Sequence, residues 1–449
     1  MQIPKAFKEF FHTKNTILIS VIFFAFVCLL ILLYFTIYGK INREISYSSY
    51  HPYTTGTPGV QGSNTYTTGT PSVTQAEGHT SNNIAQNLSS CSGNGYLTAS
   101  PLSTSAYTSI DPLGHLNPPF HNLPDDHPGF QLATTGYGSN IKSLPETVYA
   151  PGDATILEID NQSVTSSTGT INDYLITFAP CNELVFYLGH VSTLSNTLLQ
   201  QINNVKGQYK SCQVTTEKAA TSNVCQYFIN FPIKAGEVLG TAGGNVLGMD
   251  FGAYDLRTTP LAFIDQTRNI QGSDRYLHTV CPFDYYSNVS VQNQLYAKIQ
   301  NTQKGSNGLP SCGTDMEDVP NTLAGNWYVH PFSGIGADNW SEQLSFSHWE
   351  TNPDIQALVY GGTVVPNGAM IIYNPKTSGY VNRMPNQVTA DGQIYCYYQD
   401  NFTTDYGQSP QDGGHFIVQL INSTTMKIEF QSGSCPIYPK FNNPTTYIR

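Results

Sequence analysis

The sequence predicts a mainly β protein that begins with a transmembrane helix, continues with a large β domain and ends with a smaller antiparallel β barrel or sandwich. Three observations predict this fold class. Residues 16–38 form an apolar run without a charged side chain, and eight cysteines follow it. After Asp111, short β-branched and aromatic runs alternate with Gly, Pro and Asn, a pattern typical of strands joined by turns.

The apolar run, TILISVIFFAFVCLLILLYFTIY, is long enough to cross a hydrocarbon core of ~30 Å as one helix. Residues 1–15 are the predicted cytoplasmic tail, because lysines are concentrated before the run, whereas only Lys40 and Arg43 follow it closely. No small-residue cleavage site ends the run, which favours a retained signal anchor. We therefore expect a single-pass membrane protein whose bulk is extracytoplasmic, at a cell surface or envelope.

Residues 39–108 are rich in Ser, Thr, Gly, Asn and Pro and poor in aliphatic side chains, which predicts a stalk. Residues 109–305 then form the predicted first β domain, with one helix near 191–204, and residues 318–449 form the second. In the second domain, FIVQLINSTTMKIEF predicts a hairpin and Trp327 a core residue. The acidic residues of 315–318, between the domains, favour a solvated linker over a calcium site.

The cysteines after the anchor are an even set, as expected in an oxidising compartment. Sequence alone leaves the pairing open, although three local pairs are expected: Cys212 with Cys225, Cys281 with Cys312, and Cys396 with Cys435. Extracytoplasmic location also permits N-glycosylation at six Asn-x-Ser/Thr sites: Asn87, Asn161, Asn288, Asn339, Asn401 and Asn422.

Charge excludes one class of partner. Only 11% of the residues are charged and the net charge is −11, so the basic footprint that a phosphate backbone requires is missing. We expect no nucleic acid partner.

Two segments carry a resemblance to a known family. VYAPGDATILEI at residues 148–159 and FPIKAGEVLGTAGGNVLGMDFGAYD at residues 231–255 each contain a strand, a Gly-containing turn and a second strand. With FYLGHVSTLS around His190, they resemble the lysostaphin-type zinc metallopeptidases, over about residues 115–263. The resemblance implies the duplicated-hybrid-motif β fold of that family, and it implies a catalytic role for His190.

This chain departs from the zinc-binding sequence motifs of that family. Gly248, Met249 and Asp250 stand where the family has His-x-His, and His127 is followed by Gln131 where the family has His-x-x-x-Asp. The segment HNLPDDH offers His121 and His127 instead. These two imidazoles and the Asp250 carboxylate make up a His₂-carboxylate set, a composition that several catalytic zinc sites use. The candidate metal ligands are therefore His121, His127 and Asp250, with zinc as the candidate cofactor.

Two functions remain open. One is a membrane-anchored zinc hydrolase of peptide bonds in a cell-wall or surface polymer, with the stalk giving the domain reach from the bilayer. The other is a catalytically inactive relative that serves as a surface adhesin, receptor-binding or envelope structural protein, in which HNLPDDH is only a turn that satisfies backbone groups. The expected partners are the membrane, through residues 16–38, and a surface glycan, peptide or receptor.

Overall fold

Strands dominate the computed structural model, which confirms the mainly β prediction. The structure describes residues 87–118, 122–123, 125–136, 141–166, 169–205, 210–217, 220–244, 246–270, 274–305, 308–331, 342–365, 368–400 and 413–449. The predicted tail, the predicted anchor and most of the predicted stalk lie outside these ranges. Within them, no helix combines the length and the apolar character needed to cross a bilayer.

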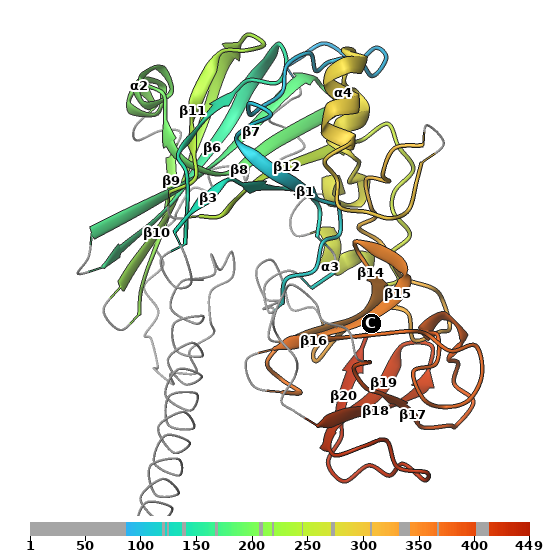
Figure 1. Ribbon diagram of the computed structural model, residues 1–449. Coiled ribbons are helices and arrows are strands. Elements are labelled where there is room, and N and C mark those ends of the chain that lie inside the picture. Colours follow the sequence, from blue (N-terminus) through green and yellow to red (C-terminus); the bar gives the residue numbers. More distant parts are fainter. Residues whose placement is uncertain are drawn as a thin grey trace, which may run out of the picture. The chain divides into compact units, whose positions relative to one another are not determined.

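The first sheet has ten antiparallel strands in the order β1-β2-β12-β8-β7-β6-β10-β9, with β11 pairing both β5 and β8 (Figure 1). Strands β6 and β7, of 13 residues each, form a hairpin in which successive side chains point to opposite faces of the sheet. The strands are β1 (Tyr107–Asp111), β2 (Gly129–Leu132), β5 (Glu146–Tyr149), β6 (Ala154–Ser166), β7 (Gly169–Cys181), β8 (Leu184–Leu194), β9 (Lys210–Glu217), β10 (Ala220–Ile233), β11 (Val238–Ala242) and β12 (Gly248–Asp255). A separate pair joins β3 (Thr134–Thr135) to β4 (Lys142–Ser143).

The core against this sheet is aromatic and aliphatic. Phe130, Phe178, Phe186 and Phe251 are completely buried, and rings from β7, β8 and β12 contact one another in stacked and tilted pairs. This packing holds β2, β8 and β12 side by side, and these three strands carry the candidate site.

The predicted helix is present but shorter. It is α2 (Asn196–Asn204), capped by Ser195, whose hydroxyl accepts a hydrogen bond from the Leu198 backbone N–H at 3.4 Å. The preceding residues, from Val191 to Leu194, belong to β8 instead. The expectation of one helix was wrong, because the described part also contains α3 (Gln266–Ile270), α4 (Val289–Tyr296) and the 3₁₀ helices η2 (Asp274–His278), η3 (Pro282–Tyr285) and η5 (Pro385–Gln387).

The second sheet has eight antiparallel strands in the order β16-β15-β14-β13-β20-β19-β18-β17. The predicted hairpin is confirmed as β18 and β19, and Trp327 is fully buried, with its indole N–H donating to the Leu323 carbonyl at 2.9 Å. The strands are β13 (Gly325–Tyr328), β14 (Gln343–Trp349), β15 (Asn352–Tyr360), β16 (Ala369–Tyr373), β17 (Tyr395–Tyr397), β18 (Gly414–Asn422), β19 (Thr425–Ser432) and β20 (Thr445–Ile448).

All three expected local disulfides are present, and the remaining pair is Cys91–Cys181. This fourth bridge ties the end of the predicted stalk to β7. Leu97, Leu102 and Ala106 are also buried in the first core. The stalk prediction for 39–108 therefore extends too far, because a few apolar residues and one long-range disulfide are enough to hold an otherwise polar segment on the domain.

Candidate functional site

The site is built around the Asp250 carboxylate on β12. The cross-strand partners of Asp250 are Gly189 on β8 and Gly129 on β2, so neither neighbouring strand places a side chain beside it. A Cβ atom at Gly189 would lie 2.8 Å from Asp250 Oδ2. Gly189 therefore leaves the space that the carboxylate occupies.

His190 faces Asp250 from β8. Its Nε2 lies 3.3 Å from Asp250 Oδ2, and its Nδ1 lies 2.7 Å from Asp173 Oδ2 on β7. The backbone at His190 has φ 59°, a left-handed value that is uncommon outside glycine, and the β7–β8 register shifts between Leu188 and Val191. Such irregularities redirect a side chain next to active sites, and this one turns the imidazole toward Asp250.

His127 faces Asp250 from the opposite side, out of the loop before β2. Its Nε2 lies 3.3 Å from Asp250 Oδ1, and its Nδ1 lies 3.1 Å from Asp125 Oδ1. The other oxygen of Asp125 lies 2.6 Å from His115 Nδ1. A carboxylate on the far nitrogen fixes the tautomer and orientation of a metal-binding histidine, which is the relation of Asp125 to His127.

The spacing of His127 and Asp250 fits a metal ion. Two ligand atoms about 2.0–2.1 Å from a tetrahedral zinc lie roughly 3.3–3.4 Å apart, and the Nε2 to Oδ1 distance is 3.3 Å. His190 Nε2 is equally close to the second oxygen of Asp250. In a metal site, this arrangement places His190 beside the ligands.

A second grouping of donors lies behind His127. In the described part of the chain, two sets of three residues have ligand atoms that are all within 4.8 Å of one another: Cys91, Cys181 and Glu183, and His115, Asp125 and His127. The first set contains a disulfide, so its sulfurs are not available as thiolates. Residues that could hold a metal ion are thus present, and they centre on the loop that contains His127.

Neighbouring carboxylates raise the pKa of each imidazole of the site. Burial lowers the pKa of His190, but the Asp250 and Asp173 carboxylates raise it more, to about 9. His115 behaves in the same way next to Asp125 and Asp111, with a pKa of about 9, and the pKa of His127 is raised well above its ordinary value. Because a ligating imidazole must be neutral, a metal cation competes with these protons.

The two positions at which this sequence departs from the zinc-binding motifs of the lysostaphin-type family lie in the same sheet. Gln131 pairs with Gly248 across β2 and β12, and its side-chain amide donates to Asp111 Oδ2. The Gln131 amide is therefore hydrogen-bonded to a neighbouring carboxylate, and Gly248 has no side chain. The ordinary ligand set of the lysostaphin-type family is not reproduced at these two positions.

Asp126, next to Asp125 in the same loop, anchors the loop to the sheet. The Tyr187 hydroxyl donates to Asp126 Oδ1 at 2.8 Å, and the Tyr254 hydroxyl donates to Oδ2. These bonds come from β8 and β12, the two strands that carry His190 and Asp250. They fix the loop that positions His127.

Three of the four predicted site residues come together: His127, His190 and Asp250. His121 lies outside the described residues, so its place in the site stays a prediction. Sequence reasoning missed Asp173 and His115. Asp173 is the only charged residue in β7, but no sequence motif connects it with His190.

The second sheet also reaches this region. Glu350 lies at the turn between β14 and β15, and its charge interacts with His115 and Asp111. The neighbouring Trp349 packs with Leu116 and Leu123 in one buried cluster. The described residues from Asn87 to Thr135 and from Lys142 to Arg449 belong to one compact unit.

Comparison with known proteins does not assign this chain to a family. No protein-family model matches the chain, and no similar curated protein was found. Among solved structures, Csd3 of Helicobacter pylori is similar at 13% identity and a TM-score of 0.18, over 36% of this chain and 32% of that one. The matched region spans about a third of Csd3, and a TM-score this low carries no argument about the fold.

Proposed function

We propose that this chain is a membrane-anchored zinc hydrolase that cuts peptide bonds in a cell-wall or surface polymer, with a divergent lysostaphin-type domain. One observation carries the proposal: the Asp250 carboxylate lies between the Nε2 atoms of His127 and His190, and each histidine is supported by an aspartate. Buried titratable groups that converge in this way are typical of catalytic sites.

In this proposal His127 and Asp250 would hold zinc, and His121 remains the predicted third ligand. Bound zinc polarises a carbonyl oxygen and lowers the pKa of a bound water. His190 holds or accepts the proton of the attacking water at Nε2, while Asp173 keeps its Nδ1 protonated. In its charged form, the same imidazole stabilises the developing oxyanion.

The location belongs to the proposal as well. Residues 16–38 anchor the chain in a membrane, residues 1–15 lie in the cytoplasm, and the bulk lies outside. The disulfides support an oxidising compartment. The polar segment between the anchor and Cys91 gives the domain reach toward a surface polymer.

Zinc content is the first test. We expect about one zinc per chain in the purified full-length protein in detergent, measured by elemental analysis. His127→Ala and Asp250→Ala each remove a ligand and should lower zinc occupancy at least about tenfold. The matched control is His348→Ala, because His348 also pairs with a carboxylate, Glu317 at 2.7 Å, but on the second sheet. Unchanged zinc in the site variants would overturn the ligand assignment.

A cleavage assay distinguishes the catalytic role of His190 from the role of the zinc ligands. His190→Ala should keep its zinc and lose at least about 100-fold in the release of dye from labelled bacterial cell wall and from quenched peptides. Asp173→Asn should retain zinc and show an altered pH profile, because it acts through His190. If His190→Ala cleaved as fast as the unmodified chain, His190 would not be catalytic.

A second candidate function rests on Gln131 and Gly248. Since neither supplies the ligand found in the family, the domain fits an inactive relative that binds a surface glycan, peptide or receptor. A folded protein without zinc and without cleavage would favour this alternative over the hydrolase.

A further inference from the structure

Two of the candidate metal ligands lie in different parts of the chain, and one disulfide connects those parts. Asp250 lies on β12, whereas His127 lies in the loop before β2. The Cys281–Cys312 disulfide joins a segment that pairs with β12 to a segment that packs on the His127 loop. Contacts on both sides of the disulfide therefore connect the two ligands.

On one side, the chain just before Cys281 is fixed to the strand of Asp250. The Val280 backbone N–H donates to the Ala253 carbonyl at 3.0 Å, and Thr279 forms an isolated antiparallel bridge with the next residue of the strand. Both contacts are with the C-terminal half of β12. Cys281 thus has a fixed place relative to the Asp250 strand.

On the other side, the chain at Cys312 packs on the loop of His127. The Leu113 N–H donates to the Cys312 carbonyl at 2.7 Å, and the Gly114 N–H donates to the Asp125 carbonyl at 3.0 Å. A Cβ atom at Gly114 would collide with a carbonyl oxygen of the segment that follows Cys312. The two backbones are therefore in direct contact.

Asp315 holds residues from both sides of the disulfide. Residues 315–318 were expected to form a solvated linker, but Asp315 is only 3% exposed, so that expectation was wrong. The segment packs on the first domain, and the Asp315 carboxylate accepts hydrogen bonds from the Asp125 backbone N–H and from the Thr279 side chain. Asp125 in turn supports His127, and Thr279 pairs with β12.

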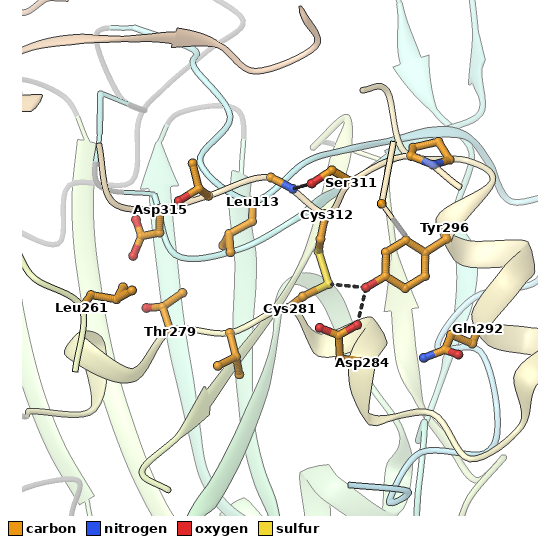
Figure 2. Close-up of a pocket in the computed structure, with 15 residues that line it drawn as sticks. Leu113, Leu261, Thr279, Cys281, Asp284, Gln292, Tyr296, Ser311, Cys312 and Asp315 are labelled. Carbon is orange, nitrogen blue, oxygen red and sulfur yellow. Dashed lines mark hydrogen bonds between the residues drawn. A yellow bond between two sulfur atoms is a disulfide. The ribbon is translucent and has the colours of Figure 1, made fainter. Parts of the chain in front are cut away.

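A pocket lies beside the disulfide, as Figure 2 shows. Both cysteines line it, and its volume is about 510 Å³, within the ~300–1,000 Å³ range of small-molecule sites. Tyr296 also lines the pocket, and its hydroxyl lies 3.5 Å from Cys281 Sγ. A small thiol or a small disulfide molecule therefore has room next to the crosslink.

We propose that formation of the Cys281–Cys312 disulfide completes the candidate metal site, by fixing the loop of His127 against the strand of Asp250. This inference rests on the proposed zinc site and adds its regulation. Because disulfides form in oxidising compartments and not in a reducing cytosol, the site retains metal only after the domain has been exported. The disulfide and Asp315 are positioning groups and do not contact the metal.

The covalent step is thiol–disulfide exchange with a small disulfide molecule. The thiolate of one cysteine attacks a sulfur of that molecule, forms a mixed disulfide and releases one small thiol. The thiolate of the other cysteine then attacks the mixed disulfide, which forms the Cys281–Cys312 bond and releases the second small thiol. Two electrons pass from the protein to the small disulfide, and the two protons of the cysteines end on the released thiols.

The first test is amide hydrogen exchange of the full-length protein in detergent, without added metal. Three amides lie where the segment after Cys312 meets the His127 loop: those of Leu113, Gly114 and Asp125. In Cys281→Ser/Cys312→Ser, we expect these amides to exchange at least about tenfold faster, because the segment is no longer tied to the β12 side. Serine is used because it introduces no free thiol that could bind zinc.

The matched control is Cys396→Ser/Cys435→Ser in the second sheet. Its sequence separation is 39 residues, against 31 for Cys281–Cys312, so loss of either crosslink has a similar effect on chain entropy. The control should leave the three amides unchanged. Equal acceleration in both double variants, or none in Cys281→Ser/Cys312→Ser, would overturn the proposal.

Asp315 provides a second test that keeps all four disulfides. Asp315→Ala removes the acceptor of the Asp125 N–H and should accelerate exchange of that amide at least about tenfold. Asp315→Asn keeps a side-chain oxygen that accepts the same hydrogen bond and should restore most of the protection. If Cys281→Ser/Cys312→Ser fails to fold, these variants still decide, because normal protection in Asp315→Ala would contradict the proposal.

Zinc retention tests the redox step. Against a competing chelator, the oxidised chain should retain zinc at least about tenfold better than a chain reduced with a phosphine, and glutathione disulfide should restore retention. Cys281→Ser/Cys312→Ser should retain zinc weakly in both states, which isolates this disulfide from the other three. Retention that is insensitive to reduction would overturn the redox role. A chain that binds no zinc in either state would overturn the hydrolase, while the exchange measurements, which need no metal, still decide whether the disulfide positions the loop.

Discussion

The two sheets of this protein bury different kinds of polar group. Around Asp250, the first sheet buries aspartates and histidines with raised histidine pKa values. The core of the second sheet is aliphatic and aromatic, and its polar atoms include the hydroxyls of Tyr360, Tyr373 and Tyr397, which lack a hydrogen-bond partner among the described residues.

This difference distinguishes what folding requires, an apolar core, from the buried charges that indicate a function. In the described part of the second sheet, antiparallel strands of this chain pack around a core without a cluster of buried carboxylates and imidazoles. The charges of the first sheet therefore lie beyond what such packing requires, and burying them is unfavourable unless they are paired. Their concentration around Asp250 is evidence for a binding or catalytic role.

The largest expected effect tests the second core. Trp327→Ala removes a fully buried indole that also contacts the Arg449 guanidinium at 4.1 Å, and it should lower the free energy of unfolding by about 3–5 kcal/mol. Urea unfolding measures this loss of stability, followed by circular dichroism because tryptophan fluorescence would change with the substitution itself. Tyr438→Ala, at a side chain that is 85% exposed, should change stability by less than about 0.5 kcal/mol. Equal effects would mean that the second core does not hold the sheet.

The next effect concerns pH. Burial raises the pKa of the Glu350 carboxyl from 4.5 to about 8. The folded state therefore binds this proton more tightly, so the stabilisation is complete below pH 4.5 and is lost as pH rises toward about 8. Glu350→Gln should remove that part of the pH dependence of urea unfolding. Asp354→Asn, an exposed change on β15, should keep it, and an unaltered profile in Glu350→Gln would contradict the assignment.

The same glycine substitution should act differently in the two sheets. Gly189→Ala places a methyl group 2.8 Å from Asp250 Oδ2 and should weaken zinc binding about tenfold by moving the carboxylate. Gly414→Ala places one 2.0 Å from the Phe430 ring and should cost about 1–3 kcal/mol of stability. Zinc titration and urea unfolding of both variants give the comparison, which fails if Gly189→Ala affects only stability.

The smallest effects come from two tyrosines. Tyr187→Phe removes the hydrogen bond to Asp126 and should cost about 1–3 kcal/mol. Tyr373→Phe removes a buried hydroxyl without a partner in the described residues and should leave stability unchanged or raise it by up to about 1 kcal/mol. Thermal unfolding of the pair checks the sign, and a loss in both would show that the Tyr373 hydroxyl is satisfied in solution.

Much of the fold was predictable because its signals are local. The hairpin of β18 and β19, the burial of Trp327 and three disulfides follow from alternation and short spacing. The end of the stalk was not predictable in this way. Cys91 pairs with Cys181 at a separation of 90 residues, and no local pattern specifies such a contact.

The candidate site was also predictable only in part. The resemblance to a family pointed to His127, His190 and Asp250, and the structure brings these residues together. Asp173 and His115 were missed because their role depends on which strands pair and how the loop before β2 folds back. Neither residue belongs to a motif that its own neighbours would reveal.

By itself, the sequence determined the β character, the turns and the residue types available for chemistry, because side-chain alternation and turn chemistry are properties of neighbouring residues. Only the tertiary structure decided that two glycines flank Asp250, that an aspartate supports each histidine, and that Asp315 is buried. These relations join residues far apart in the chain, and strand order, register and packing fix them together.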